Sequence, residues 1–159
     1  MKILISNDDG IFAPGIKALV SAFAKAGYEV YVAAPDSQRS AASHSMTLFR
    51  PLTAKETAFE GAVKAWAIDG TPVDCVKLAV ETLCPEVEAV LSGINHGYNA
   101  GSDVLYSGTV GAAMEGALSG KPAMAVSLGY EREDTYDKAA ALAVEVFNKA
   151  KTQTLPACS

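Results

Sequence analysis

The chain of 159 residues lacks long hydrophobic runs, paired cysteines and an excess of basic residues. Its apolar runs span only a few residues, whereas a membrane-spanning helix needs about 20, so we expect no membrane span. The three cysteines, Cys75, Cys84 and Cys158, show no pairing pattern, which is typical of a reducing compartment. Asp8 and Asp9 interrupt the first apolar stretch too early for a secretory signal peptide. These absences together predict a cytoplasmic protein.

Basic charge is also scarce, because 13 lysines and arginines stand against 18 acids and the net charge is −5. A groove for duplex nucleic acid needs a basic face, so the composition argues against that partner. A small phosphorylated substrate stays compatible with the charge, since one bound metal ion can make a single site locally positive. Half of the residues are hydrophobic, at a length typical of one domain, so we expect residues 1–159 to fold as a single domain.

Strand-like and helix-like segments alternate along the chain. Short apolar runs predict strands at residues 2–6, 28–34, 62–68, 87–91 and 122–128, with a less regular one at 46–49. Helical periodicity predicts helices at residues 16–26, 71–83, 108–119 and 136–151. In the last helix, Leu142, Val146 and Phe147 are predicted to face the core. This alternation indicates an α/β fold with a mostly parallel sheet and helices on both faces.

Three polar loops follow predicted strands, at residues 7–14, 35–45 and 92–106. The carboxyl ends of parallel strands lie at one edge of the sheet, where ligands bind in folds of this kind. In the first loop, Asp8 and Asp9 repel each other unless a cation lies beside them, and such hard oxygen ligands suit Mg²⁺, Mn²⁺ or Ca²⁺. The alternative is an ordinary turn, since Asn, Asp and Gly are turn formers.

The other two loops offer basic, hydroxyl and amide groups. Arg39 either holds a phosphate or neutralises Asp36, and His44 is either a general acid or a solvated bystander. The side-chain oxygen of an asparagine such as Asn95 is a hard, neutral metal ligand.

Small and hydroxyl residues begin the helix that follows the third loop. Ser107, Gly108 and Thr109 form either an anion site, with free N–H groups and the helix dipole, or an ordinary N-cap. A Walker loop is missing, and no G-x-G-x-x-G motif follows the first strand. The sequence therefore disfavours a nucleoside triphosphatase and a dinucleotide-dependent oxidoreductase.

Five short motifs follow one another in order along the chain. They are Asn7-Asp8-Asp9-Gly10, Ala34-Pro35-Asp36 with Arg39-Ser40, Gly70-Thr71-Pro72 with Asp74-Cys75-Val76, Ser92-Gly93-Ile94-Asn95, and Tyr106-Ser107-Gly108-Thr109-Val110. Together they resemble the SurE family, the stationary-phase survival proteins. The resemblance implies a three-layer Rossmann-like fold and a metal-dependent phosphatase acting on nucleoside 5′- and 3′-monophosphates. It also implies a homodimer or homotetramer.

Carried over residue by residue, the resemblance implies a site for one divalent ion per subunit, Mn²⁺ or Mg²⁺. Its ligands fall on Asp8, Asp9, Ser40 and Asn95. The phosphate-binding residues fall on Ser107, Gly108 and Thr109, with Asn99 beside them. Asp8 and Asp9 are the catalytic residues of this interpretation, and a competing mechanism makes Asp8 a nucleophile.

Two other functions stay open at this point: a nucleotide-sugar-dependent transferase and a non-catalytic nucleotide-binding protein. Proteins of the family usually continue beyond the position of Ser159. We therefore expect the 159-residue form to fold around its sheet but to assemble poorly, with one sheet edge uncovered.

Overall fold

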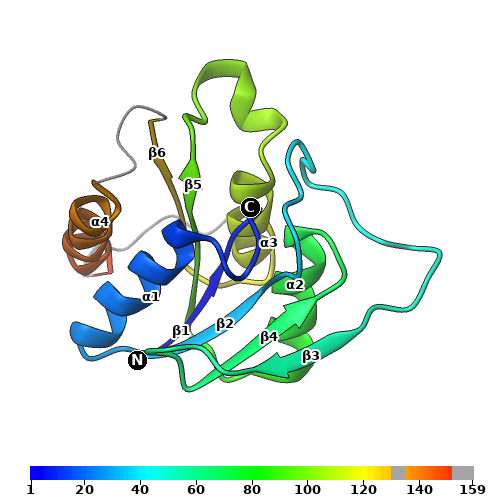
Figure 1. Cartoon of the computed structure of the whole chain (residues 1–159), viewed down its shortest axis with the longest axis horizontal. Helices are drawn as coiled ribbons and strands as arrows, with labels where there is room; N and C mark the ends of the chain where they lie inside the picture. The colour runs from blue at the N-terminus through cyan, green and yellow to red at the C-terminus, as the bar shows by residue number, and fades with distance from the viewer. Residues whose placement is uncertain (130–134, 152–159) are drawn as a thin grey trace.

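In the computed structural model, which describes residues 1–129 and 135–151, the strands of this part of the chain form one six-stranded sheet (Figure 1). They are β1 Lys2–Ser6, β2 Glu29–Pro35, β3 Ala54–Thr57, β4 Lys64–Ile68, β5 Ala89–His96 and β6 Ala123–Leu128. The order across the sheet is β3-β4-β2-β1-β5-β6. Every neighbouring pair is parallel except β3 and β4, so the predicted mostly parallel sheet is confirmed.

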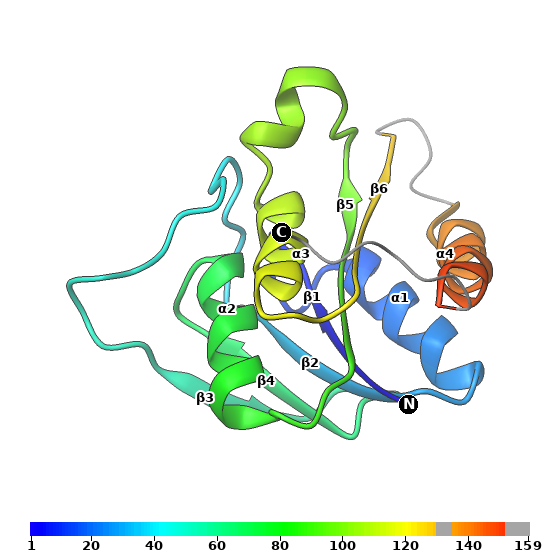
Figure 2. The same cartoon turned by 180° about the vertical axis from the view of Figure 1, so that it is seen from behind.

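Helices cover both faces of the sheet, as Figures 1 and 2 show from opposite sides. One face carries α1 Pro14–Lys25 and α4 Tyr136–Ala150. The other carries α2 Pro72–Leu78, which continues as the π-helical turn η1 Ala79–Leu83, and α3 Gly108–Leu118. A short 3-10 turn, η2 Gly101–Leu105, lies in the loop beyond β5. This is the predicted three-layer α/β fold.

Local sequence signals explain where the helices begin. Pro14 occupies the first turn of α1, where its missing N–H is no loss. In α2, the Thr71 hydroxyl accepts from the Asp74 N–H while the Asp74 carboxylate accepts from the Thr71 N–H, a complete capping box. Ser107 caps α3 by accepting a hydrogen bond from the Val110 N–H (3.1 Å).

Two predictions about the core and the strands are wrong. Leu142 and Val146 are 60% and 46% exposed, whereas α4 buries Phe147 together with Tyr136 and two alanines. Because alanine side chains are small, this face lets α4 lie close against α1, and the larger residues remain outside.

The segment at 46–49 is not a strand, and the antiparallel edge strand β3 lies at Ala54–Thr57 instead. Its sequence, Ala-Lys-Glu-Thr, is mostly exposed and carries no apolar signal. β5 also continues to His96, beyond the predicted end at residue 91. The long strand carries Asn95 out to the carboxyl edge of the sheet.

Cys75 and Cys84 are buried free thiols, as their spacing along the chain predicts, and Cys158 lies outside the described residues. In the part of the chain that the structure describes, no helix has both the length and the apolar character needed to cross a membrane.

Candidate active site

The first polar turn closes directly after β1, in the middle of the sheet. The Asn7 side-chain amide donates to the Gly10 carbonyl (2.9 Å), and the Ile11 N–H donates to the Pro35 carbonyl at the end of β2 (2.9 Å). These bonds hold Asp8 and Asp9 at the carboxyl edge of β1. The sequence prediction that the acids lie at this edge is confirmed.

The Asp8 side chain is buried, with 7% of the residue exposed, and it faces the start of α3. Its Oδ1 accepts a hydrogen bond from the Thr109 hydroxyl (2.5 Å). A Cβ atom at Gly108 would lie 2.9 Å from the Asp8 Cβ, so only glycine lets the helix approach this closely. Burial raises the pKa of Asp8, the Thr109 hydrogen bond opposes that rise, and the neighbouring charge of Asp9 adds to it.

Asp9 is half-buried and turns toward β5, where its Oδ2 accepts from the His96 N–H (3.1 Å). Burial raises its pKa as well, while the His96 hydrogen bond acts against the rise. Two adjacent carboxylates are therefore held in surroundings that disfavour their negative charge. A cation between or beside them would reverse that electrostatic cost.

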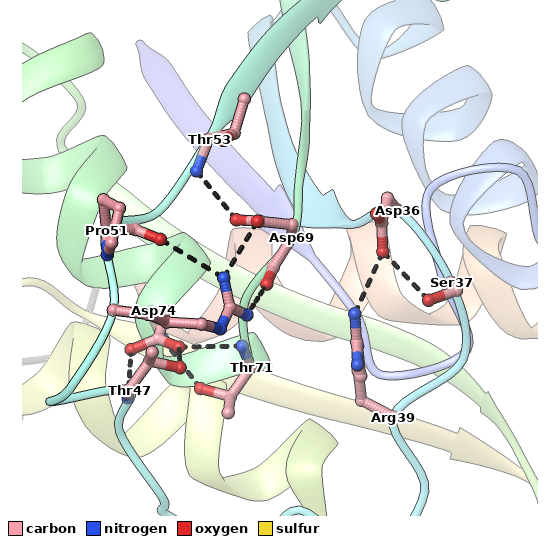
Figure 3. Close-up of polar contacts among 10 residues, drawn as sticks. Asp36, Ser37, Arg39, Thr47, Pro51, Thr53, Asp69, Thr71 and Asp74 are labelled. Atoms are coloured by element: carbon pink, nitrogen blue, oxygen red, sulfur yellow. Dashed lines mark hydrogen bonds and ion pairs between the residues drawn. The ribbon is translucent and has the colours of Figure 1, made fainter.

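The second polar loop reaches the same edge through its backbone. The Arg39 N–H donates to the Asp8 carbonyl (2.7 Å), which brings Ser40, the next residue, to the turn that carries the acids. Ser40 itself is exposed, and its hydroxyl accepts from the Gln38 side chain (2.9 Å). The Arg39 guanidinium pairs with Asp36 (3.1 Å), as Figure 3 shows, which is one of the two roles predicted for it.

The predicted asparagines lie at and beyond the end of β5. Asn95 is half-buried beside His96, and its amide donates to the Gly97 carbonyl (2.9 Å), which leaves the side-chain oxygen as the group for a metal ion. Asn99 lies further out, and its amide donates to the Ser127 hydroxyl (2.8 Å). The structure thus brings Asn95 to the strand end that Asp9 contacts, while the Asn99 side chain bonds to β6.

The predicted phosphate-binding residues sit at the N-terminus of α3, next to Asp8. Ser107 and Thr109 are both buried, and each hydroxyl already has a partner within the protein. Thr109 bonds directly to Asp8, an interaction that the sequence alone did not indicate. The first turn of α3 and the buried acid are therefore one connected unit.

A divalent cation fits the donors that the fold collects here. Two carboxylates of raised pKa share one turn, and the buried Oδ1 of Asn7 has no hydrogen-bond partner among the described residues. Within residues 1–129 and 135–151, no three His, Cys, Asp or Glu side chains cluster as a metal site. A site at this edge would therefore draw on serine and asparagine oxygens as well, which suits a hard ion such as Mn²⁺ or Mg²⁺.

His44 is not the solvated bystander that was one of its two predicted roles, and the role of general acid stays a prediction. Its Nε2 lies 3.0 Å from Oε2 of the buried Glu115 on α3, and Lys77 lies 3.6 Å from the other oxygen of that carboxylate. Nothing near His44 in the sequence pointed to this contact, because its partner is 71 positions away in a helix of small residues. His96, to which no role was assigned, contributes its backbone N–H to Asp9.

Comparison with known proteins identifies close relatives along almost the whole chain. A family model described as "Survival protein SurE" matches residues 3–158. A protein named 5′-nucleotidase SurE from Synechococcus elongatus is 51% identical over 159 residues, covering 98% of this chain and 62% of that protein. One of the same name from Desulforudis audaxviator is 52% identical over 145 residues, covering 90% of this chain and 56% of that protein.

A solved structure shows the same fold. The crystal structure of the SurE protein from Aquifex aeolicus superposes with a TM-score of 0.87 at 38% identity, covering 98% of this chain and 62% of that chain. The chain thus spans about three-fifths of the length of the relatives that it matches.

Proposed function

The chain belongs to the SurE family, and on that premise we propose that it hydrolyses nucleoside 5′- and 3′-monophosphates to nucleoside and phosphate in a metal-dependent reaction. Relatives of about 50% identity are named 5′-nucleotidases. The observation that carries the proposal is the surroundings of Asp8. This buried carboxylate adjoins a second acid on one side and the N-terminus of a helix on the other.

In this proposal Asp8 and Asp9, together with Ser40 and Asn95, hold one Mn²⁺ or Mg²⁺ ion per subunit. When bound, such an ion supplies Lewis-acid chemistry by drawing charge from the phosphate oxygens. The protein fixes the direction of both acids, since Asp8 is held by Thr109 and Asp9 by the His96 N–H.

The phosphate is proposed to lie against the first turn of α3, where Ser107, Gly108 and Thr109 begin the helix. N–H groups at a helix N-terminus point toward an anion, and the helix dipole has the same sign there. The lack of a side chain at Gly108 lets this turn lie directly against Asp8. Asn99 is proposed to lie at the margin of the phosphate site. Donors fixed in advance stabilise the charge that develops on the non-bridging oxygens.

Asp8 is proposed to act as a metal ligand, and the nucleophilic alternative has a direct test. A nucleophilic Asp8 would form an aspartyl-phosphate, with the nucleoside oxygen as leaving group, and water would then release the phosphate. Brief mixing with a ³²P-labelled nucleotide followed by acid quenching would trap that species. Recovery of labelled protein that depends on Asp8 would establish the nucleophilic mechanism and overturn the ligand-only role.

The experiment for the function itself is phosphate release from a panel of 5′- and 3′-nucleotides, with and without Mn²⁺. We expect release from both classes, with loss of activity in a chelator and recovery on adding metal. Transfer of a sugar from a nucleotide sugar, without free phosphate, would support the transferase instead. Nucleotide binding without turnover would support a binding protein. Assembly as a homodimer or homotetramer remains a prediction that sedimentation of the same sample measures.

A further inference from the structure

The loop at residues 36–53 joins β2 to β3 and carries the proposed metal ligand Ser40. Within the described residues, the only side-chain hydrogen bond of Ser40 comes from Gln38, two positions away. The backbone at Ala41 and Ser43 has φ values of 54° and 52°, in the left-handed region that non-glycine residues rarely adopt. The position of Ser40 is therefore imposed by whatever holds the loop on either side of it.

Before Ser40, the loop is held at the active-site turn itself, by the Arg39 N–H on the Asp8 carbonyl (2.7 Å). After Ser40, the loop is held by contacts with α2 and α3. The strongest of these later contacts belong to a residue of the Gly70–Val76 motif that the proposed reaction does not otherwise use.

That residue is Asp74, a buried carboxylate in the first turn of α2, with 3% of the residue exposed. Its Oδ1 accepts from the Thr47 N–H (2.9 Å), and its Oδ2 accepts from the Thr47 hydroxyl (2.6 Å) and from the Thr71 N–H (2.8 Å). The Thr71 hydroxyl also donates to the Ser45 carbonyl (2.7 Å). Figure 3 shows Thr47 and Thr71 converging on the one carboxylate.

A helix cap alone does not account for this arrangement. From the Asp74 carboxylate, a capping box requires only that it accept a hydrogen bond from the Thr71 N–H. Two further hydrogen bonds reach Thr47, which is 27 positions away in the chain. A buried carboxylate with several N–H and O–H donors is among the stronger contacts available to a protein, so it is well suited to fix a long loop.

A second set of contacts holds the same segment on α3. The Ser43 N–H donates to the Tyr106 carbonyl (3.0 Å), and His44 pairs with the buried Glu115 (3.0 Å). A Cβ atom at Gly111 would lie 2.4 Å from the Ser43 carbonyl oxygen, so the loop rests directly on the helix backbone. The segment from Arg39 to Thr47 thus runs from the turn that carries Asp8 and Asp9, the acidic turn, across α3 to α2.

We propose that Asp74 is a positioning residue for the reaction: by fixing Thr47 at the start of α2, it holds the loop so that Ser40 stays beside the turn that carries Asp8. The inference rests on the proposed function, because Ser40 matters there as a metal ligand. Asp74 itself touches neither metal nor substrate, and it acts through the loop.

The test compares two carboxylates that anchor the same loop at different distances from Ser40. Asp74→Asn keeps the size of the side chain but replaces one acceptor oxygen by an NH₂ donor, which opposes the donors of Thr47 or Thr71. Asp69→Asn is the matched control. Asp69 accepts from the Thr53 N–H (2.7 Å) and from Arg50 (2.8 Å), and thus anchors only the far end of the loop (Figure 3).

For Asp74→Asn we expect faster amide hydrogen exchange in residues 39–47 of the metal-free protein. We also expect Mn²⁺ binding, measured by calorimetry, to weaken about tenfold, which corresponds to roughly one lost hydrogen bond to a charged group. Saturating Mn²⁺ should then restore kcat in the folded variant, whereas loss of a catalytic group would leave kcat reduced. Asp69→Asn should leave Mn²⁺ affinity unchanged.

Thr47→Val supplies a second variant should Asp74→Asn fail to fold, because it removes one loop bond and leaves the α2 cap intact. It should move exchange and Mn²⁺ affinity in the same direction and by less. If both variants match Asp69→Asn in exchange and in Mn²⁺ affinity while the wild-type protein is active, the positioning role is overturned and the proposed function stands. A wild-type protein without Mn²⁺-dependent phosphate release overturns the proposed function and the role of the loop with it.

Discussion

The two faces of the sheet differ in the side chains that pack on them. On the α1 and α4 face, Phe23 packs against Tyr28 and Phe147, with ring centroids 5.3 and 5.7 Å apart, within a cluster of large apolar side chains. The α2 and α3 face buries Trp66 and Tyr31 of the strands, and the helices contribute small residues to it, such as Ala112 and Cys75.

Buried polar groups are concentrated on the second face. They include Asp8, Asp74, Ser107, Thr109 and Glu115. Each of the four that follow Asp8 contacts the acidic turn, the loop at 36–53 or the first turn of α3. We infer that the α1 and α4 face, hereafter the aromatic face, supplies stability, while the α2 and α3 face supplies the close approaches that a polar site requires.

The largest expected effect tests the aromatic face. Phe23→Ala removes a fully buried ring and should lower the free energy of unfolding by about 3–5 kcal/mol. Since no residue of the proposed site contacts this ring cluster, Mn²⁺ affinity should be unchanged at temperatures where the variant is folded. Urea unfolding and calorimetry measure the two quantities. Leu118→Ala, at an exposed position of α3, is the control and should change stability little. A loss of Mn²⁺ affinity in folded Phe23→Ala would break the division between the faces.

The next effect tests the acidic turn. Asp9→Asn should reduce Mn²⁺-dependent phosphate release by at least about 100-fold, because it removes a charged ligand of the proposed metal. The metal-free protein should be as stable as the wild type or more so, since burial disfavours the Asp9 charge. Glu145→Gln, an exposed acid of α4, should retain full activity. Near-normal activity of Asp9→Asn at limiting Mn²⁺ would remove Asp9 from the metal site.

Sequence patterns predict the buried strands and α1 better than the exposed strand β3 and the buried side of α4. Periodic apolar residues mark α1, and the buried strands β1 and β2 lie within one residue of their predicted bounds, because burial of side chains is what creates those patterns. The exposed strand β3 has no such pattern and was missed. The helix α4 was found, but its alanine-rich sequence left the buried face ambiguous, so Leu142 and Val146 were placed inside in error.

For the candidate site, the sequence predicts which loops come together but not the contacts between their residues. Because the carboxyl ends of parallel strands lie at one edge of a sheet, the sequence predicts that the Asp8 turn, the loop of Ser40 and the end of β5 lie together. The structure agrees. The bonds from Thr109 to Asp8 and from Thr47 to Asp74 join residues 101 and 27 positions apart. Such contacts depend on how helices pack on the sheet, which no local pattern encodes.

A smaller effect concerns the free-energy cost of burying Asp8 and Asp9 as charged groups. Burial raises the folded-state pKa of Asp8 and of Asp9 above the ordinary value of 3.8. The stability that these groups contribute is therefore fully present below 3.8 and is lost as pH rises through their folded pKa. At neutral pH a bound divalent ion should offset this loss.

We expect Mn²⁺ at 100 times its dissociation constant to raise the free energy of unfolding by about 2.7 kcal/mol at neutral pH. Thermal unfolding with and without Mn²⁺ measures the gain. It should shrink on acidification, because protons then compete for both carboxylates, and it should be lost in Asp9→Asn. A gain that is the same at acidic and neutral pH would show that the ion binds elsewhere.

The smallest effect separates two roles for Thr109 at the boundary between the acidic turn and α3. Its hydroxyl donates to Asp8 and lowers the pKa of that carboxyl, so Thr109→Val should raise it further. Because metal binding requires the ionised acid, the acid limb of the kcat/KM profile should move to higher pH, and activity well above that limb should change little. Thr57→Val, on the edge strand β3, is the isosteric control and should leave the profile unchanged. If Thr109→Val instead keeps the acid limb and raises KM for the nucleotide at every pH, the hydroxyl serves the phosphate, and the bond to Asp8 gives way when substrate binds.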